Sequence, residues 1–265
     1  MAALPLTEGE LDKLAIVLVR ARDPNNIGAV ARAMHDFGFR RLRIATEYPV
    51  SFHRARSAVD ASAVLAAAEE YSSVAEAVAD CNLVVGTTAV GLRRQQHEIS
   101  TLAEAAGVIR PMLRSAKVAL LFGSEKTGLS NEELSHCNWL LTIPMHQTDG
   151  MRHASMNLGQ AVAVCLYELV RATPSVSLEV PEYAPAAEQE RLTELLIEVM
   201  KASEYSRRHP ANFDGIMVRR LVRHMALDRS RALAWTGILR QVLWRLQTTQ
   251  GFDASEEEPT TERGR

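Results

Sequence analysis

The stretch "VALLFGSEKTGLS", Val118 to Ser130, decides the fold of the region around it. Its first five residues, Val118–Phe122, are continuously apolar, as is typical of a strand buried on both faces of a parallel sheet. A polar loop bracketed by two glycines follows, and Ser130 begins an S-N-E-E capping box with Glu133 three residues later. The stretch therefore predicts a buried strand, a glycine-rich loop and the start of a helix.

Apolar runs of the same kind recur along residues 1–172 and alternate with alanine-rich stretches that have helical spacing. Further strands are predicted at Leu14–Val19, Arg41–Ala45, Leu83–Thr87 and Leu140–Ile143. Helices are predicted at Ile27–Phe37, Ala55–Tyr71, Val74–Asp80, Leu102–Leu113 and Ser155–Arg171, with Ser72 and Thr101 as N-caps. Five strands separated by helices predict an α/β fold with a helix-covered parallel sheet.

The composition is that of a globular protein, since 47% of the 265 residues are hydrophobic, 23% are charged and the formal net charge is −2. Three cysteines, Cys81, Cys137 and Cys165, lack C-x-x-C or metal-ligand spacing and are predicted to be buried free thiols, which suit a reducing cytoplasm. No signal-peptide pattern and no apolar run of about 18 residues is present, so we expect a cytoplasmic protein that has no membrane contact. The histidines are scattered, and no metal site is assigned.

The composition changes at "TPSVSLEVPEYAPAAE", residues 173–188, which carries three prolines and no helical period. We therefore predict an α/β domain at 1–172, a linker at 173–188, a basic helical module at 189–249 and an acidic flexible tail at 250–265. The stretch from Lys201 to Arg245 contains ten basic and three acidic residues, which gives it a local net charge of +7. Arg219, Arg220 and Arg223 crowd one helix without balancing acids, which favours contacts with RNA phosphates over the alternative of a solvated helical face.

The loop that runs from Gly123 to Gly128 has the glycine spacing of a phosphate-binding loop. However, Leu129 follows where a nucleotide-triphosphate site needs lysine, so that interpretation loses its most important charge. No predicted strand leads into a G-x-G-x-x-G pattern, which disfavours a dinucleotide-binding fold. A glycine-rich turn without a ligand remains the alternative for this segment taken alone.

Two other strand ends deliver polar side chains toward the same edge of the predicted sheet. The first strand leads into "RDPNNIGAVARAMHDFG", where Asn25 and Asn26 are expected to cap the next helix and Arg32 follows six residues after Asn26. The last strand leads through "TIPM" to "SMNLGQAVAVCLYEL", which carries Ser155 and Asn157. Ligands of open α/β sheets bind at the carboxyl edge, where these three segments should meet.

Together the three segments resemble the motifs of the SPOUT superfamily, and specifically of SpoU-type RNA 2′-O-ribose methyltransferases. The N-x5-R helix, "FGSEKTGLS" and "IPM…SMNLGQAVAVCLYEL" match in order and spacing over residues 14–172. The later stretch "VRRLVRHMALDRSRALAWTGILRQVL" is similar to the C-terminal extension of bacterial enzymes that methylate the ribose of nucleotide 32 in tRNA anticodon loops. The resemblance thus implies formation of Cm32 or Um32 in tRNA.

The resemblance also implies a C-terminal trefoil knot, a homodimer and a pocket for S-adenosyl-L-methionine. Carried over residue by residue, it assigns cofactor binding to Thr87, Thr88, Ala89, Gly123, Ile143, Ala154, Ser155 and Met156. It assigns catalysis to Arg32, Asn26, Glu125, Ser155 and Asn157. Because a guanidinium is protonated far above neutral pH, we expect Arg32 to orient the ribose hydroxyl by its charge, in preference to removing the proton itself.

Several alternatives remain open at this point. The enzyme could methylate another tRNA position or ribosomal RNA, and no residue decides between cytidine and uridine. A non-catalytic RNA-binding protein of the same fold is a rival, although it would not need the whole set of Asn26, Arg32, Glu125 and Asn157. A phosphotransferase that uses the Gly123–Gly128 loop predicts ATP binding where the methyltransferase predicts S-adenosylmethionine binding.

Overall fold

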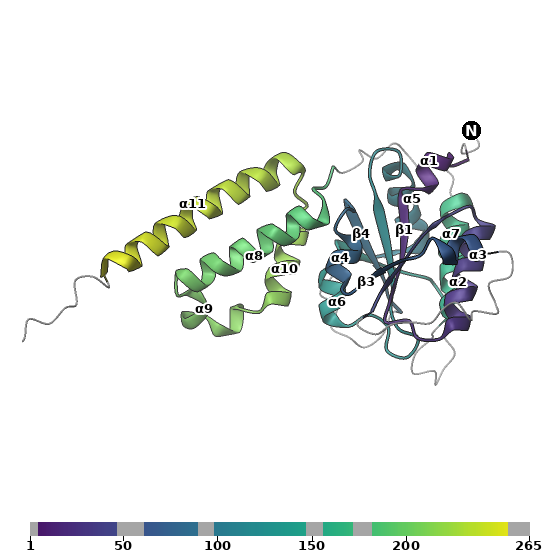
Figure 1. The fold of residues 1–265 in the computed structure, drawn as a ribbon, viewed down its shortest axis with the longest axis horizontal. Coiled ribbons are helices and arrows are strands. Elements are labelled where there is room, and N and C mark those ends of the chain that lie inside the picture. The colour runs from purple at the N-terminus through teal and green to yellow at the C-terminus, as the bar shows by residue number, and fades with distance from the viewer. Residues whose placement is uncertain (1–4, 47–60, 90–97, 147–155, 172–181, 254–265) are drawn as a thin grey trace, which may run out of the picture.

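The computed structural model describes residues 5–46, 61–89, 98–146, 156–171 and 182–253. Within these ranges seven parallel strands form one sheet in the order β3-β2-β1-β6-β4-β7-β5 (Figure 1). The strands are β1 Leu14–Val19, β2 Arg41–Ala45, β3 Glu69–Tyr71, β4 Leu83–Thr87, β5 Ile99–Thr101, β6 Val118–Phe122 and β7 Trp139–Thr142. The α/β prediction is confirmed.

Helices cover both faces of the sheet, and the central strands β1 and β6 are buried along their whole length. The helices of the sheet domain are α1 Glu8–Leu11, α2 Pro24–Asp36, α3 Ser62–Ala66, α4 Val74–Val78, α5 Leu102–Met112, α6 Asn131–Ser135 and α7 Leu158–Arg171. Apolar residues of α2, α5 and α7 pack with one face of the strands into the larger core. Residues of α4 and α6 pack with the other face into a smaller core.

The predicted strands agree with the structure, with the last one displaced by one residue to Trp139–Thr142. The predicted helix Ala55–Tyr71 is wrong at its end, because Glu69–Tyr71 forms the short edge strand β3. The other short edge strand, β5, was not predicted, since three residues give too little alternation to be noticed. Residues 55–60 of that predicted helix lie outside the described residues.

Two predicted helix caps are also wrong by a few residues. Ser73, and not Ser72, caps α4 by accepting a hydrogen bond from the backbone N–H of Glu76. Asp23 caps α2 in place of Asn25 and Asn26, because Pro24 has a fixed φ and no N–H and so suits the first helical position. The predicted caps Thr101 and Ser130 are confirmed, each within a complete capping box.

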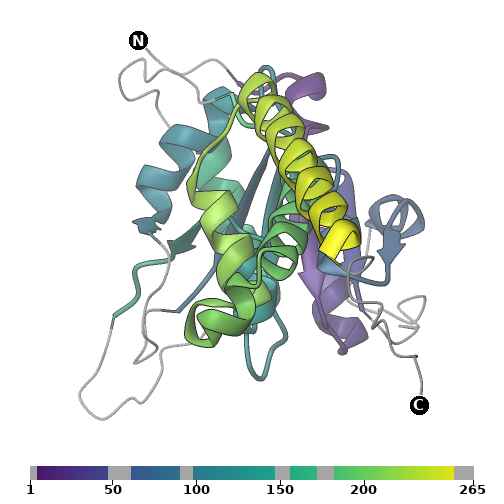
Figure 2. The same ribbon diagram turned by 90° about the vertical axis from the view of Figure 1, so that its left-hand side faces the viewer.

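The second module consists of helices only, and it docks on the α4 and α6 side of the sheet (Figures 1 and 2). Its elements are α8 Ala186–Ala202, α9 Tyr205–Arg208, a 3-10 turn at Pro210–Asn212, α10 Gly215–His224 and α11 Arg229–Asp253. Leu192, Val222, Leu227, Ala232 and Leu239 form its buried core. The free thiols of Cys81, Cys137 and Cys165 are buried, as predicted.

The helical module begins earlier than predicted. Helix α8 starts at Ala186, inside the predicted linker, and Ala186 is buried in the smaller core of the sheet domain. The backbone N–H of Ala186 donates to the carbonyl of Cys81 over 2.8 Å. Residues 172–181, which include the end of the predicted domain and part of the predicted linker, lie outside the described residues. Residues 147–155 also lie outside them, and the predicted trefoil knot stays a prediction.

Candidate active site

Three of the predicted catalytic residues meet at the carboxyl edge of the sheet through hydrogen bonds. Nδ2 of Asn26, on the first turn of α2, donates to Oε1 of Glu125 in the loop after β6 over 3.1 Å. Oδ1 of Asn26 accepts from Nδ2 of Asn157, just before α7, over 3.0 Å. Residues from the three sequence motifs are thus joined into a single polar chain.

The orientation of this chain is set by the start of α7. Oδ1 of Asn157 accepts from the backbone N–H groups of Gly159 (3.0 Å) and Gln160 (3.4 Å), so it caps that helix. Its Nδ2 is therefore the group left to face Asn26. A Cβ atom on Gly159 would lie 2.6 Å from Cβ of Ala29, so glycine is needed where α7 crosses α2. This close crossing brings Asn157 to Asn26.

Arg32 lies further along α2 and is about half exposed. Its Nε donates to both carboxylate oxygens of Asp36, over 3.1 Å and 3.2 Å. Hydrogen bonds from His35 and then from Arg32 hold the pKa of Asp36 below its ordinary value. Asp36 thus stays ionised and fixes the direction of the Arg32 side chain without neutralising its charge.

The loop after β6 closes on itself through its backbone. The N–H of Gly128 donates to the carbonyl of Ser124 over 2.8 Å. A Cβ atom on Gly123 would lie 2.2 Å from the carbonyl carbon of Gly128 and 2.2 Å from the nitrogen of Leu129, which leaves no room for any side chain. Gly128 has a φ of +65°, which favours glycine for a different reason. The two glycines of the motif therefore serve two distinct steric purposes.

The predicted cofactor-binding residues after β4 lie beside this loop, because β4 pairs with both β6 and β7. Oγ1 of Thr87 donates to the carbonyl of Leu121 over 2.9 Å, and the N–H of Thr88 donates to the carbonyl of Leu141 over 2.9 Å. Of the other predicted residues of this set, Ala89 is exposed, and Ile143 and Met156 are half-buried. Ala154 and Ser155 lie outside the described residues.

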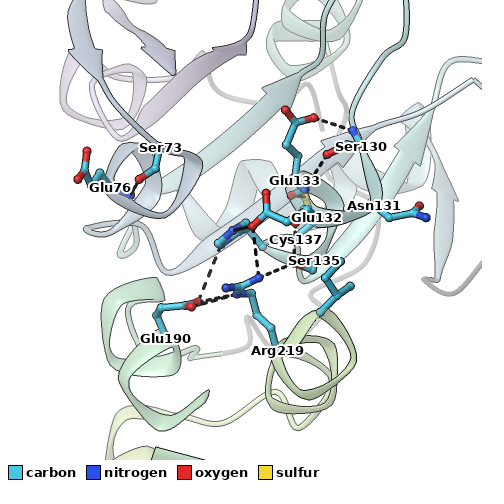
Figure 3. Close-up of polar contacts among 12 residues, drawn as sticks. Ser73, Glu76, Ser130, Asn131, Glu132, Glu133, Ser135, Cys137, Glu190 and Arg219 are labelled. Atoms are coloured by element: carbon cyan, nitrogen blue, oxygen red, sulfur yellow. Dashed lines mark hydrogen bonds and ion pairs between the residues drawn. The ribbon is translucent and has the colours of Figure 1, made fainter. Parts of the chain in front are cut away.

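Two of the three arginines predicted to bind RNA, Arg219 and Arg220, contact the sheet domain. Nε of Arg219 donates to both carboxylate oxygens of Glu190 over 3.0 Å, and its Nη1 donates to Oγ of Ser135 over 3.0 Å (Figure 3). Arg220 donates to the carbonyl of Asn131 over 3.4 Å. Arg223 is only 2% exposed. In this conformation Arg219 and Arg223 fasten α10 to its neighbours and present little charge to solvent.

One residue of this region that sequence reasoning missed is Arg20, at the end of β1. Its guanidinium contacts both Glu133 and the carbonyl of Gly128. The capping box pointed to Glu133, but nothing in the sequence pairs two residues that are 113 positions apart. Within the part of the chain that the structure describes, no three His, Cys, Asp or Glu residues gather as a metal site requires, and no helix is long and apolar enough to span a membrane.

Comparison with known proteins identifies the family of this chain. Residues 13–167 match the family model described as the SpoU rRNA Methylase family. The chain belongs to this family. The match covers β1 through most of α7, and therefore the elements that carry Asn26, Glu125 and Asn157. The resemblance inferred from the three motifs is confirmed.

Relatives within the SpoU family resemble the helical module as well. The tRNA (cytidine/uridine-2′-O-)-methyltransferase TrmJ of Sodalis glossinidius is 31% identical over 258 residues, which cover 91% of this chain and 93% of that protein. The crystal structure of TrmJ from Z. mobilis superposes with a TM-score of 0.73 at 28% identity, covering 91% of this chain and 99% of that one. Both matches extend well beyond the sheet domain.

Other relatives match over a shorter span. The tRNA (cytidine-2′-O-)-methyltransferase TrmJ of Methanocaldococcus jannaschii is 33% identical over 159 residues, 59% of this chain and 66% of that protein. The chain likewise spans just under two thirds of the length of similar methyltransferases from Haemophilus influenzae and Pseudomonas aeruginosa.

Proposed function

We propose that this protein is an S-adenosylmethionine-dependent methyltransferase that acts on a ribose 2′-hydroxyl of tRNA. The observation that carries the proposal is the chain of hydrogen bonds from Glu125 through Asn26 to Asn157 at the carboxyl edge of the sheet. Arg32 extends from the same helix as Asn26. A purely RNA-binding protein would have no need to fix this set of amide and carboxylate groups.

The residues at the strand ends fit the proposed cofactor. Gly123 allows the loop backbone to pack closely against Gly128 and Leu129, and the ends of β4 and β7 add small or apolar residues, Thr87, Thr88 and Ile143. Such a surface suits an adenosine, whereas the triphosphate of ATP would require a lysine after Gly128, where Leu129 is buried instead. When bound, S-adenosylmethionine supplies an electrophilic methyl group. Ala154 and Ser155, which the resemblance also assigns to the pocket, lie outside the described residues and remain predictions.

The chain's own residues must deal with a hydroxyl that is a very weak acid. The guanidinium of Arg32 is a hydrogen-bond donor with no acceptor atom, so its role is to hold the 2′-oxygen in line and to stabilise the negative charge that grows on it. Asp36 keeps the guanidinium in place from one side. The ribose is oriented by the hydrogen-bonded side chains of Asn26, Glu125 and Asn157. Such orientation lowers the activation barrier because less entropy is lost on reaching the transition state.

Nucleotide 32 of the anticodon loop is the proposed position. It is supported by the match of 91% of the chain to a relative named tRNA (cytidine/uridine-2′-O-)-methyltransferase. For RNA contact we favour the exposed arginines of α9, Arg207 and Arg208, over the buried Arg223.

The protein is also proposed to act in the cytoplasm as a homodimer. On α7, Tyr167 and Val170 remain exposed in the single chain and offer an apolar surface for a partner.

The test is transfer of a labelled methyl group from S-adenosylmethionine to tRNA isolated from cells that lack ribose methylation. Three proteins are compared: the native chain, Arg32→Ala and the control Arg114→Ala, whose side chain is 74% exposed and lies outside the site. We expect label on a ribose of the anticodon loop with the native chain and the control, and none with Arg32→Ala. We do not expect the loss to come from unfolding, because exposed ion pairs such as Arg32–Asp36 add little stability.

Each other result selects a different function. Label on ribosomal RNA would keep the chemistry and overturn the tRNA assignment. S-adenosylmethionine binding without labelling of any RNA would favour the non-catalytic RNA-binding protein. Titration with ATP beside S-adenosylmethionine separates both from a phosphotransferase, which would bind ATP alone.

A further inference from the structure

Arg20 has an unusual backbone for its residue type. It follows the last residue of β1 with a φ of +54°, in the left-handed region that non-glycine residues seldom occupy. Its N–H nevertheless continues the sheet by donating to the carbonyl of Ala45 over 2.9 Å. A left-handed non-glycine residue is retained only where the surrounding contacts hold it, so the contacts of its side chain are the place to look for the reason.

The guanidinium of Arg20 makes three hydrogen bonds with two elements. Its Nε and Nη2 donate to the two carboxylate oxygens of Glu133 over 2.5 Å and 3.0 Å, the paired geometry that arginine forms best. Nη2 also donates to the carbonyl oxygen of Gly128 over 3.1 Å. Oε2 of Glu133 in turn accepts from the N–H of Ser130 over 2.6 Å. The side chain therefore holds both ends of the segment from Gly128 to the start of α6.

This contact lies next to the proposed cofactor loop. The backbone of Gly128 packs so closely against Gly123 that a Cβ atom on Gly123 would collide with its carbonyl carbon. A displacement of Gly128 would therefore also displace the Gly123 side of the loop. Strands β1 and β6 are neighbours, with Leu18 opposite Phe122, which places Arg20 within reach of the loop that follows Phe122. Arg20 thus joins the strand that leads to Asn26 with the loop that carries Glu125.

We propose that Arg20 is a positioning residue, which sets the shape of the Gly123–Leu129 loop for the methyl donor by holding the Gly128 carbonyl and the Glu133 carboxylate together. The inference rests on the proposed function for the identity of the ligand, but the positioning itself is a property of the free protein. A lysine could keep the charge at this site. It could not make the paired bonds to Glu133 and the bond to Gly128 at once.

The experiment compares full-length native protein with Arg20→Lys and Arg20→Gln. The matched control is Arg171→Lys, because Arg171 makes the same paired contact with Glu168 on α7, away from the loop. Two quantities are measured: the dissociation constant of S-adenosylmethionine by calorimetry, and hydrogen exchange of the Gly128 amide relative to amides of β6. In the labelling assay, KM for S-adenosylmethionine and KM for tRNA are determined separately.

Both Arg20 variants should bind S-adenosylmethionine about tenfold more weakly, as expected for loss of one charge-assisted hydrogen bond. The Gly128 amide should exchange faster in them while amides of β6 keep native rates, and KM for tRNA should stay within about twofold of native. Arg171→Lys should match the native chain throughout.

Native exchange at Gly128 in Arg20→Lys would overturn the inference whether or not any ligand binds. It would also be overturned by a raised KM for tRNA with an unchanged affinity for S-adenosylmethionine, since Arg20 would then contact the RNA directly. Failure of the native chain to bind S-adenosylmethionine, with faster Gly128 exchange in the variants, would instead reject the proposed function and leave the positioning role standing.

Discussion

Nδ2 of Asn157 donates to Oδ1 of Asn26 over 3.0 Å and so joins two residues that are 131 positions apart in the sequence. Each asparagine has a second partner, the N–H groups at the start of α7 for Asn157 and Glu125 for Asn26. The two amides therefore cannot rotate independently. A substitution of Asn26 should therefore change the positions of both Glu125 and Asn157.

Asn26→Asp tests that relationship. The new carboxylate can still accept from Asn157, but it loses the donor to Glu125 and places a second negative charge about 3.1 Å from it. Since like charges at this distance repel and a lost bond to a charged group costs about 1.5–3 kcal/mol, we expect kcat for methyl transfer to fall by at least about tenfold. Asn25→Asp on the same turn is the control, and equal losses in the two variants would contradict the role given to Asn26.

The two loop glycines should respond differently to alanine. Gly123→Ala puts a Cβ atom 2.2 Å from the backbone of residues 128 and 129, so the loop has to open and S-adenosylmethionine binding should be lost. Gly128→Ala meets nothing within 4 Å, and its cost is only the left-handed φ of +65°, about 1 kcal/mol of stability. Calorimetric titration of both variants checks this, and tight binding by Gly123→Ala would rule out a cofactor wall at this loop.

The buried ring of His136 should make stability depend on pH. Burial, followed by the charges of Arg219 and Arg223, lowers the pKa of His136 from 6.5 to about 3, although Glu132 and Glu190 face the ring at 3.4 Å and 3.9 Å. The unfolded chain binds the proton first as pH falls. The stability contributed by the neutral ring is therefore complete above pH 6.5 and is lost progressively toward pH 3.

Urea unfolding between pH 7 and pH 4 measures this effect. Below pH 6.5 the His136 proton should add about 1.4 kcal/mol per pH unit to the fall in the free energy of unfolding. His136→Gln should remove that increment while the carboxylates shared by both proteins keep their own contribution. Identical slopes for the two proteins would show that the native ring is protonated or exposed.

Arg219 and Arg223 provide a matched pair for stability. Nε and Nη1 of Arg223 have no hydrogen-bond partner within the described structure, and burial lowers its pKa to about 10. Arg223→Met should leave the free energy of unfolding within about 1 kcal/mol or raise it, because an incompletely paired buried charge adds little. Arg219→Met should lower it by about 1–3 kcal/mol, since Glu190 and Ser135 both lose a donor. The opposite order in urea unfolding would contradict this assignment.

The sequence was sufficient for features that depend on short-range pattern. The apolar runs located the five long strands, and the capping boxes located α5 and α6, because each signal lies within a few neighbouring residues. The edge strands β3 and β5 were missed because three residues carry no readable period. The predicted start of α2 was wrong because Pro24 suits the first turn, a preference that outweighs the capping tendency of Asn25 and Asn26.

In the candidate site, too, the sequence indicated which residues matter but not their contacts with distant parts of the chain. The resemblance supplied Asn26, Glu125 and Asn157, and the structure added the bonds that join them. The role expected of Arg219 and Arg223 followed from charge alone, and charge does not say whether a helix face meets solvent or a neighbouring helix. Arg20 carried no local signal, since its partners Gly128 and Glu133 lie more than 100 residues away in the sequence.

The burial of Ala186 limits where the chain can be divided into a sheet domain and a helical module. Its side chain fills the smaller core of the sheet domain, and its N–H satisfies the carbonyl of Cys81, although it belongs to the first turn of α8. A junction placed at the proline-rich stretch would remove a piece of the domain's interior. Exchange of the helical module between relatives should therefore succeed only when the crossover falls inside α8, so that Ala186 travels with the sheet it helps to fill.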